Sequence, residues 1–170
     1  SMKSLAFVFL YICLMVLPRN MHAQEKPFLP EDFRVPDTLE TEHFRLRMLT
    51  VNDVVKDYDA VMTSVNELQK QFPHWGWPAS DLSFEQDLID LGWHQKEFQR
   101  RTSFAYTVVS PDESQVLGCL YIFPTTKGDF DATAEMWVRT SVLEKGYDEL
   151  LYKAVRTWME KEWPFEKVAY

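Results

Sequence analysis

A glycine between a strand pattern and a helix pattern marks the first place where this chain could bind a ligand. Ala134, Met136 and Val138 alternate with polar or bulky residues, which is typical of a strand, and a long amphipathic pattern follows Gly146. The first-turn N–H groups of such a helix have no partners within it, and the helix dipole attracts negative charge to them. The pattern therefore predicts an anion site, although an ordinary βα unit of a sheet has the same sequence signature.

The helix after Gly146 has the strongest pattern in the chain. Its apolar positions form one stripe at helical spacing, made up of Tyr147, Leu150, Leu151, Ala154, Val155, Trp158 and Met159. Asp148 and Glu149 lie in the first turn, where negative charge suits the helix dipole. Pro164 then ends the helix.

Two tryptophans flank Gly76 in the loop 73–82. Aromatic side chains often line the clefts that bind small molecules, so Trp75 and Trp77 are candidates for a substrate pocket. The same residues would also fit a loop that two large apolar side chains fix to the core.

Few other side chains suggest catalysis or metal binding. Cys119 lies in an apolar strand pattern and is expected to be an unreactive core residue, and His94 is expected to have a surface or packing role. Cys13 is the other cysteine of the sequence, so no cysteine metal site is expected. The sequence also lacks a Ser–His–Asp pattern and a His/Glu ligand spacing, which argues against a hydrolase and against a metal site.

Length and composition indicate one domain with a substantial core. The chain has 170 residues, of which 46% are hydrophobic and 15% are aromatic. Its formal net charge is −8. A nucleic-acid surface needs a basic face that neutralises phosphates, so this charge argues against DNA or RNA as a partner.

Residues 1–23 have the pattern of a signal peptide. Lys3 precedes an unbroken apolar run, Leu5 to Leu17, which is shorter than the ~20 residues that span a bilayer. Pro18 breaks the run, and Ala23 is a small residue of the kind found at cleavage sites. We therefore expect an exported or periplasmic protein if this segment is a signal peptide, and a cytoplasmic one otherwise. An uncleaved anchor and an apolar helix packed on the domain are the alternatives.

The rest of the chain divides into an extended, proline-bearing lead-in, 24–42, and a domain, 43–170, with elements in the order β-α-α-β-β-β-α-β. The expected strands are 43–49, 104–109, 116–123, 132–139 and 165–170, and the expected helices begin near Asp53, Ser83 and Gly146. The last helix implies a right-handed crossover and a parallel pair, and the three middle strands form an antiparallel meander. The fold class is therefore α/β (α+β), with a mixed and mostly antiparallel sheet.

Two residues define details of these elements. Pro73 should end one continuous helix that begins near Asp53. Gly118 lies inside a strand pattern, where glycine indicates a β-bulge or a close approach of two backbones.

The order of elements and the strand–turn–helix around Gly146 resemble the GCN5-related N-acetyltransferase (GNAT) superfamily over residues 43–170. The resemblance includes PheAlaTyrThrVal in one strand, LeuGlyCysLeuTyrIle in the next and AlaGluMetTrpValArg in the central strand. In this superfamily a loop of the form Arg/Gln-x-x-Gly-x-Gly/Ala follows the central strand and binds the pyrophosphate of acetyl-CoA. The matching stretch, 143–148, keeps Gly146 but has Leu143 and Asp148 in place of the usual residues.

The resemblance implies an enzyme that transfers an acetyl group from acetyl-CoA to a primary amine of a small-molecule or peptide acceptor. Glu135 would accept the proton of the amine, directly or through a water, although it would also fit a solvated strand face. The residues implied at the cofactor are Trp137, Val138 and Arg139 for the pantetheine arm, and Lys145, Gly146, Tyr147 and Asp148 for the pyrophosphate. Trp75 and Trp77 are then candidates for the acceptor site.

Other readings of these residues remain open. The carboxylate of Asp148 would repel the pyrophosphate unless it turns away, and Lys145 would offset part of that charge. Arg139 would either bind phosphate or cap the end of its strand. The alternative function is a non-catalytic binding domain on the same scaffold, which the exported N-terminus and the degenerate loop both favour.

Members of this superfamily usually continue beyond the fifth strand with a helix and further strands, which are absent from this sequence. The strand 165–170 would then present an open edge with Val168 and Ala169, and the helix face near Trp158 and Trp163 would be poorly covered. We therefore expect a homodimer through the C-terminal strand edge, a longer biological chain, or a lead-in that folds back over the edge.

Overall fold

The computed structural model describes residues 27–170. The predicted signal peptide, 1–23, lies outside the described residues, so this interpretation and the localisation that depends on it stay predictions. Within the described range, no helix combines the length and the apolar character needed to cross a membrane.

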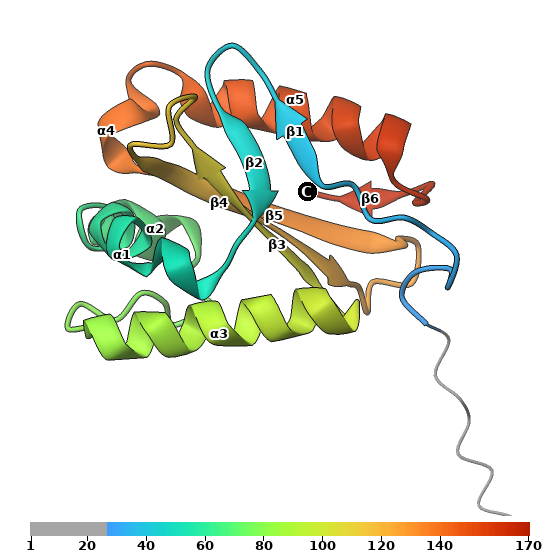
Figure 1. Cartoon of the computed structure of the whole chain (residues 1–170), viewed down its shortest axis with the longest axis horizontal. Coiled ribbons are helices and arrows are strands. Elements are labelled where there is room, and N and C mark those ends of the chain that lie inside the picture. Colours follow the sequence, from blue (N-terminus) through green and yellow to red (C-terminus); the bar gives the residue numbers. More distant parts are fainter. Residues whose placement is uncertain (1–26) are drawn as a thin grey trace, which may run out of the picture.

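One six-stranded sheet forms the centre of the molecule, and its strand order follows the sequence from β1 to β6 (Figure 1). The strands are β1 (Thr38–Glu40), β2 (Arg45–Met48), β3 (Phe104–Val109), β4 (Val116–Pro124), β5 (Ala132–Val138) and β6 (Val168–Ala169). Neighbours are antiparallel except β5 and β6, which are parallel. The predicted meander, the parallel pair and the mixed fold class are therefore confirmed.

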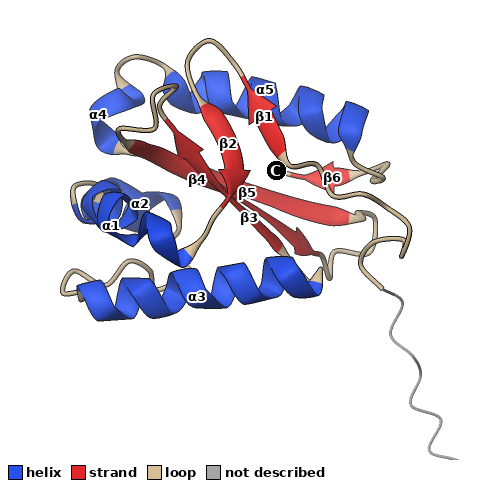
Figure 2. Ribbon diagram, viewed as in Figure 1, coloured by secondary structure: helices blue, strands red, loops and turns tan. Residues whose placement is uncertain are grey.

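Helices cover both faces of the sheet (Figure 2). They are the 3-10 turn η1 (Val51–Asp53), α1 (Val54–Met62), α2 (Val65–Gln71), α3 (Phe84–Arg100), α4 (Thr140–Leu143) and α5 (Tyr147–Glu162). α5 lies on one face, and α1, α2 and α3 lie on the other. Each face buries its own apolar cluster, so the sheet is covered on both sides over most of its area.

The residues predicted to begin the two long helices, and the proline predicted to end the second, are confirmed. The Ser83 hydroxyl caps α3 by accepting a hydrogen bond from the backbone N–H of Gln86 at 3.1 Å. Gly146 precedes α5 in the left-handed conformation, with φ of 73°, which glycine adopts without strain. α5 ends at Glu162, shortly before Pro164.

The prediction of one continuous helix up to Pro73 is wrong, because Thr63 and Ser64 separate α1 from α2. The Thr63 hydroxyl donates to the carbonyl of Asp59 at 2.6 Å. The Ser64 hydroxyl accepts a hydrogen bond from the N–H of Thr140 at 3.0 Å, which ties the break to the start of α4. Hydroxyl side chains that bond to nearby backbone groups compete with a continuous helix in this way.

Other elements also differ from the predictions. The lead-in 24–42 is not only a linker, since it contains the edge strand β1, which pairs with β2. The short helix α4 stands between β5 and Gly146, where we expected only a turn. β6 covers only Val168–Ala169 of the predicted strand 165–170.

The lead-in also lies over the core, so the expectation that Trp158 and Trp163 are poorly covered is wrong. These residues are buried, with 6% and 5% of their surface exposed. Phe33 lies against Trp163 with ring centroids 5.9 Å apart, and Phe28 stacks on Phe165 at 5.1 Å. The homodimer stays a proposal, because β6 has no further strand on its outer side within the described sheet.

The central strand β5 has two different edges. Every residue of β5 is paired with β4, whereas β6 pairs only with Ala132 and Thr133. The backbone of 134–138 therefore has no strand partner on that side within the described residues. Successive side chains of a strand alternate between the two faces, and Glu135 lies on the face covered by α1 to α3.

Candidate functional site

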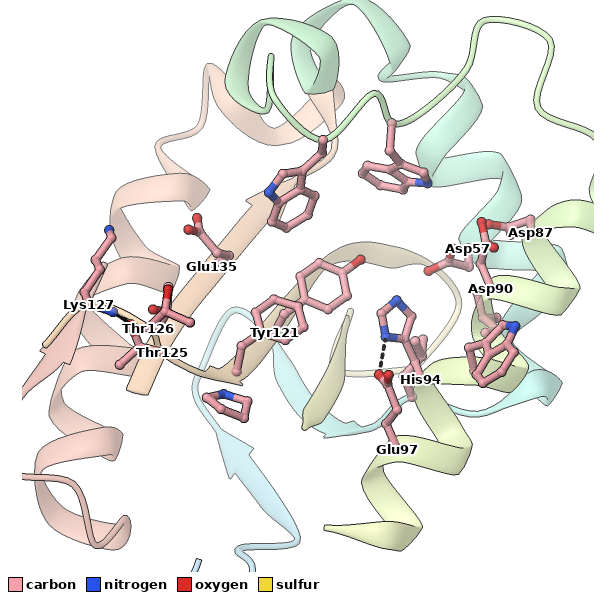
Figure 3. Close-up of a pocket in the computed structure, with 18 residues that line it drawn as sticks. Asp57, Asp87, Asp90, His94, Glu97, Tyr121, Thr125, Thr126, Lys127 and Glu135 are labelled. Carbon is pink, nitrogen blue, oxygen red and sulfur yellow. Dashed lines mark hydrogen bonds and ion pairs between the residues drawn. The ribbon is translucent and has the colours of Figure 1, made fainter. Parts of the chain in front are cut away.

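A cavity of about 680 Å³ lies on the face of the sheet that α1 and α3 cover (Figure 3). Residues of α1, the loop 73–82, α3, β4, β5 and the loop between β4 and β5 line it. The titratable side chains that line it are Asp57, Asp87, Asp90, His94, Glu97, Tyr121, Lys127 and Glu135. Carboxylates outnumber cationic groups in this wall, and we call the cavity the acidic pocket.

Glu135, the predicted base, projects from β5 into the acidic pocket. Tyr121 stands directly across from it on β4, because the two residues are partners in the sheet register. The Tyr121 hydroxyl accepts a hydrogen bond from the indole N–H of Trp137 at 3.3 Å. Burial raises the pKa of Tyr121 well above its usual value, so this side chain is an uncharged wall of the pocket beside Glu135.

Trp75 and Trp77, the two predicted aromatic residues, both line the acidic pocket. Trp75 stacks on Phe72 with ring centroids 4.2 Å apart and meets Tyr121 edge-on at 5.8 Å. The ring of Trp77 lies 6.0 Å from that of Trp137. The two side chains therefore fix their loop to the core and also form part of a cavity wall, while their role in binding a substrate stays a prediction.

Asp57 and Asp87 form a buried pair of carboxyl groups across the pocket from Glu135 (Figure 3). Asp57 belongs to α1 and Asp87 to α3, and only 4% and 1% of their surfaces are exposed. Burial raises the pKa of Asp57 well above its usual value and that of Asp87 to about 6, and neighbouring carboxylates add to both effects. A hydrogen bond joins the two side chains, which requires one carboxyl group to hold a proton.

His94 also lines the acidic pocket from α3, although the sequence indicated only a surface or packing role. Its Nδ1 lies 3.9 Å from Oε2 of Glu97, and its ring centroid lies 5.0 Å from that of Tyr121. Burial lowers the pKa of His94, so the imidazole is mainly neutral near pH 7 and can accept a proton from a bound group.

A second cavity, of about 370 Å³, lies beside the unpaired edge of β5, and we call it the β5 groove. The residues that line it are Gln71, Met136, Trp137, Val138, Leu143, Asp148, Glu149, Leu151 and Tyr152. The side-chain amide of Gln71 donates to the carbonyl of Met136 at 2.7 Å, so one backbone group of this edge already has a partner. β5 is thus a common wall of the groove and of the acidic pocket.

The residues expected at a cofactor fall into two groups. Trp137, Val138 and Asp148 line the β5 groove, whereas Arg139, Lys145, Gly146 and Tyr147 do not. The N–H of Gly146 donates to the carbonyl of Leu143 at 2.9 Å within the turn. The ring of Tyr147 lies against His43 and Phe44. The first turn of α5 is therefore the part of this segment that offers N–H groups without intrahelical partners.

The side chain of Arg139 is held inside the fold. Only 7% of the residue is exposed, and its guanidinium forms an ion pair with Asp59 at 2.9 Å. It also donates to the Thr63 hydroxyl at 3.2 Å and to the carbonyl of Val116 at 3.2 Å. These bonds connect the end of β5 with α1 and β4, which matches the strand-capping interpretation of Arg139.

Sequence reasoning missed Asp57 and Asp87, although the helical patterns contained a signal for both. Asp57 stands between Val54 and Val61 on the buried face of α1. Asp87 lies one turn before Leu91 on the buried face of α3. Aspartate is almost never fully buried unless it is paired, so an acidic residue at an apolar-stripe position indicates a special environment.

The described residues offer little for metal or thiol chemistry. Within 27–170, no group of three or more His, Cys, Asp or Glu side chains is arranged to hold a metal ion. Cys119 is buried, and burial raises the pKa of its thiol well above the usual value. Its expected role as a core residue is therefore confirmed.

Comparison with known proteins gives matches in structure but not in sequence. No protein-family model matches the chain, and no curated protein matches it significantly. A protein from Vibrio cholerae assigned as a ribosomal-protein-serine acetyltransferase superposes with a TM-score of 0.60 at 15% identity, over 75% of this chain and 70% of the other.

Two further structures were solved with coenzyme A or its acetyl ester bound. The ribosomal L7/L12 alpha-N-protein acetyltransferase RimL, in complex with coenzyme A, has a TM-score of 0.56 at 17% identity, over 72% of this chain and 67% of its own. The microcin C7 self-immunity acetyltransferase MccE, in complex with acetyl-CoA and AMP, has a TM-score of 0.52 at 11% identity, over 71% and 64%. Together with the strand order, these likenesses show that residues 27–170 have the fold of the GCN5-related N-acetyltransferase superfamily.

Proposed function

We propose that this protein is an N-acetyltransferase that moves an acetyl group from acetyl-CoA to a primary amine. The observation that carries the proposal is the position of β5 between two cavities. Glu135 faces the acidic pocket, and the neighbouring residues Met136 to Val138 border the β5 groove. An amine in the pocket and a thioester in the groove would therefore meet at the same stretch of one strand.

The β5 groove suits the pantetheine part of acetyl-CoA better than its diphosphate. Met136, Leu143 and Leu151 make its wall largely apolar, and the unpaired edge of β5 offers backbone groups to an extended amide chain. Asp148 and Glu149 line the end of the groove at the start of α5, where their carboxylates oppose a bound diphosphate. We therefore expect the fit to be good at the acyl end and weak at the nucleotide end.

The acidic pocket would bind the acceptor as an ammonium ion and prepare it for reaction. The Glu135 carboxylate takes a proton from the ammonium group, which frees the nitrogen lone pair. That nitrogen forms a bond to the thioester carbonyl carbon as the carbon–sulfur bond breaks. The sulfur leaves as a thiolate, which takes up the second proton that the nitrogen loses as the amide forms. Acetyl-CoA supplies the activated acyl group, and the chain supplies the base and the alignment of the two reactants.

A non-catalytic binding domain on the same fold is the second candidate. Two observations favour it, namely the carboxylate of Asp148 beside the start of α5 and the hydrogen bond by which Gln71 occupies the carbonyl of Met136. Both features would compete with coenzyme A for the β5 groove.

Direct binding of coenzyme A tests the proposal first. Calorimetric titration of the full chain should show binding of coenzyme A, and Gly146→Glu should abolish it. A side chain at this position would strain the left-handed turn, and its charge would repel the diphosphate. A wild-type protein that binds no coenzyme A would contradict the enzyme and leave the binding-domain alternative.

Loss of the base tests the chemistry separately. Glu135→Gln should keep the affinity for coenzyme A but lower the rate of acetyl transfer to amines by about a hundredfold to ten-thousandfold, as expected for a lost general base. Release of the coenzyme A thiol in the presence of an amine panel measures this rate. A variant with the wild-type rate would show that Glu135 is part of a solvated strand face and not a base.

A further inference from the structure

We propose that the acidic pocket contains a second cation site, formed by Asp57, Asp87 and Asp90, and that the acceptor is a small molecule with two amino groups. One amino group would react beside Glu135, and the other would be held by these aspartates. The part of the inference that concerns the reacting amino group rests on the proposed function. The existence of the cation site does not depend on that function.

The first observation is one buried carboxylate oxygen without a donor, although the Asp87 side chain also shares a hydrogen bond with Asp57. Only 1% of Asp87 is exposed, and its Oδ2 accepts no hydrogen bond from a donor group of the described residues. Asp87 and Asp57 both line the cavity, so these carboxyl groups are in contact with the space that a ligand would fill. Buried polar atoms are almost always satisfied in folded proteins, and a bound ammonium group would supply the missing donors.

The second observation is that no cationic side chain neutralises this site. Within 27–170, neither Asp57, Asp87 nor Asp90 forms an ion pair with a lysine, arginine or histidine. In Figure 3, Lys127 lies on the side of Glu135, away from the aspartates. A cation from outside the described residues is therefore the partner that this end of the pocket lacks, since buried charges are normally paired.

The third observation is the shape of the space between the two ends. Figure 3 shows Glu135 on one side of the pocket and the three aspartates on the other, with the ring of Tyr121 between them. Trp75 and Trp77 add further aromatic surface to the wall. The pocket is therefore acidic at both ends and aromatic between them. A molecule with an amino group at each end of an aliphatic chain fits this arrangement.

A matched pair of amines tests the inference on the full-length protein. Putrescine has an amino group at both ends of a four-carbon chain, and butylamine has the same chain with one amino group. We expect calorimetry to show putrescine binding about tenfold tighter than butylamine or better, since an ammonium–carboxylate contact contributes at least that factor. Equal affinities, or no binding of either amine, would overturn the inference.

Neutral variants locate the site. Asp87→Asn and Asp57→Asn should each remove most of the preference for putrescine and leave the affinity for butylamine nearly unchanged. Glu85→Gln is the matched control, because it removes one negative charge from the same helix at an exposed position outside the pocket. Melting temperatures of all variants check that they fold. A preference for putrescine that survives both aspartate variants would refute the assignment.

Titration with coenzyme A separates the two proposals. If coenzyme A does not bind but putrescine binds with the expected dependence on Asp57 and Asp87, the cation site stands and the acetyltransferase proposal fails. If coenzyme A binds and butylamine is acetylated as well as putrescine, the acetyltransferase stands and the second cation site is refuted.

Discussion

Gly118 in β4 lies very close to the backbone of β5. Among the glycines of the described residues, it leaves the least room for a side chain. A Cβ atom at this position would lie 1.9 Å from the carbonyl oxygen of Trp137, and the register of β3 and β4 shifts beside it. The predicted bulge and close approach are therefore confirmed. Because the obstructing atom belongs to the backbone, no side-chain rotation can make room for a methyl group.

Gly118→Ala should consequently destabilise the fold. We expect the free energy of unfolding, measured by urea denaturation, to fall by about 3 kcal/mol, the upper end of the usual range for an overpacked core. Gly128→Ala is the matched control, because a Cβ atom at that position meets no other atom within 4 Å. Two variants of equal stability would contradict the close approach.

The buried carboxyl pair makes the stability of the fold depend on pH. Burial raises the pKa of Asp87 to about 6 and raises that of Asp57 as well. In an unfolded chain the pKa of aspartate is about 3.9. Between these values the folded protein binds more protons than the unfolded chain. This contribution to stability is therefore fully present below about pH 4 and is lost as the pH rises through about 6.

Asp87→Asn should remove much of this pH dependence. We expect the variant to be about 1 to 3 kcal/mol more stable than the wild type at about pH 8, and close to it at about pH 4. Urea denaturation at both pH values measures the difference. Asp81→Asn, which changes an exposed aspartate, is the control and should follow the wild type. A stability difference between Asp87→Asn and the wild type that is independent of pH would refute the argument.

At the scale of single residues, the sequence predicted those site residues that belong to a recognisable local pattern. Glu135 and the two loop tryptophans could be singled out because a strand pattern and a glycine-flanked loop contain them, and all three line the acidic pocket. Asp57 and Asp87 lie on separate helices, which only tertiary packing brings together. Each is an acidic residue at an apolar-stripe position of its own helix, so local spacing could indicate an unusual environment but not that the two residues form a pair.

At the scale of elements, the start of α5 has the geometry of an anion site but an unfavourable charge. Gly146 in the left-handed conformation leads into the helix, whose first N–H groups have no intrahelical partners. Asp148 stands in this first turn and lines the β5 groove. Its carboxylate therefore occupies the region where the helix dipole would otherwise favour a diphosphate.

Asp148→Asn should tighten the binding of coenzyme A. We expect a gain of about twofold to fivefold, which corresponds to the usual effect of one charge at a helix terminus. Calorimetric titration at low salt measures it, and the gain should decrease as salt is added. Glu144→Gln, which neutralises an exposed residue at the end of α4 outside the groove, is the control. A gain of the same size in the control would show a long-range effect of net charge.

The elements were predictable where one pattern extends over a whole segment. β3, β5 and α5 have periodic apolar residues and clear start or stop residues, and their order was enough to indicate the fold. The break between α1 and α2 was not predictable, because one of the hydrogen bonds that hold it, from Thr140 to Ser64, connects distant parts of the chain. β1 and α4 are too short for a period to be recognised.

At the scale of the whole molecule, the lead-in belongs to the folded core. Leu29 is 3% exposed and lies in the same apolar cluster as α5. Arg101 donates to the carbonyls of Pro30 and Phe33 at 2.9 and 3.0 Å, which fixes the lead-in to the end of α3. The ring of Phe33 contacts Trp163. The lead-in therefore covers apolar surface that would otherwise be available to a second copy of the chain.

The proposed homodimer therefore depends on the outer edge of β6 and on how firmly the lead-in is held. β6 is only two residues long, and very short edge strands pair weakly with other chains. We expect light scattering on the wild type to show a mean mass that rises slowly with protein concentration. Phe33→Ala should steepen the rise, because loosening the lead-in uncovers the apolar ring of Trp163. Phe84→Ala, which removes a 38% exposed aromatic ring at the start of α3, on the other face of the sheet, should behave as the wild type. A constant single-chain mass for the wild type and for Phe33→Ala would refute self-association and leave the lead-in as a permanent cover of a monomer.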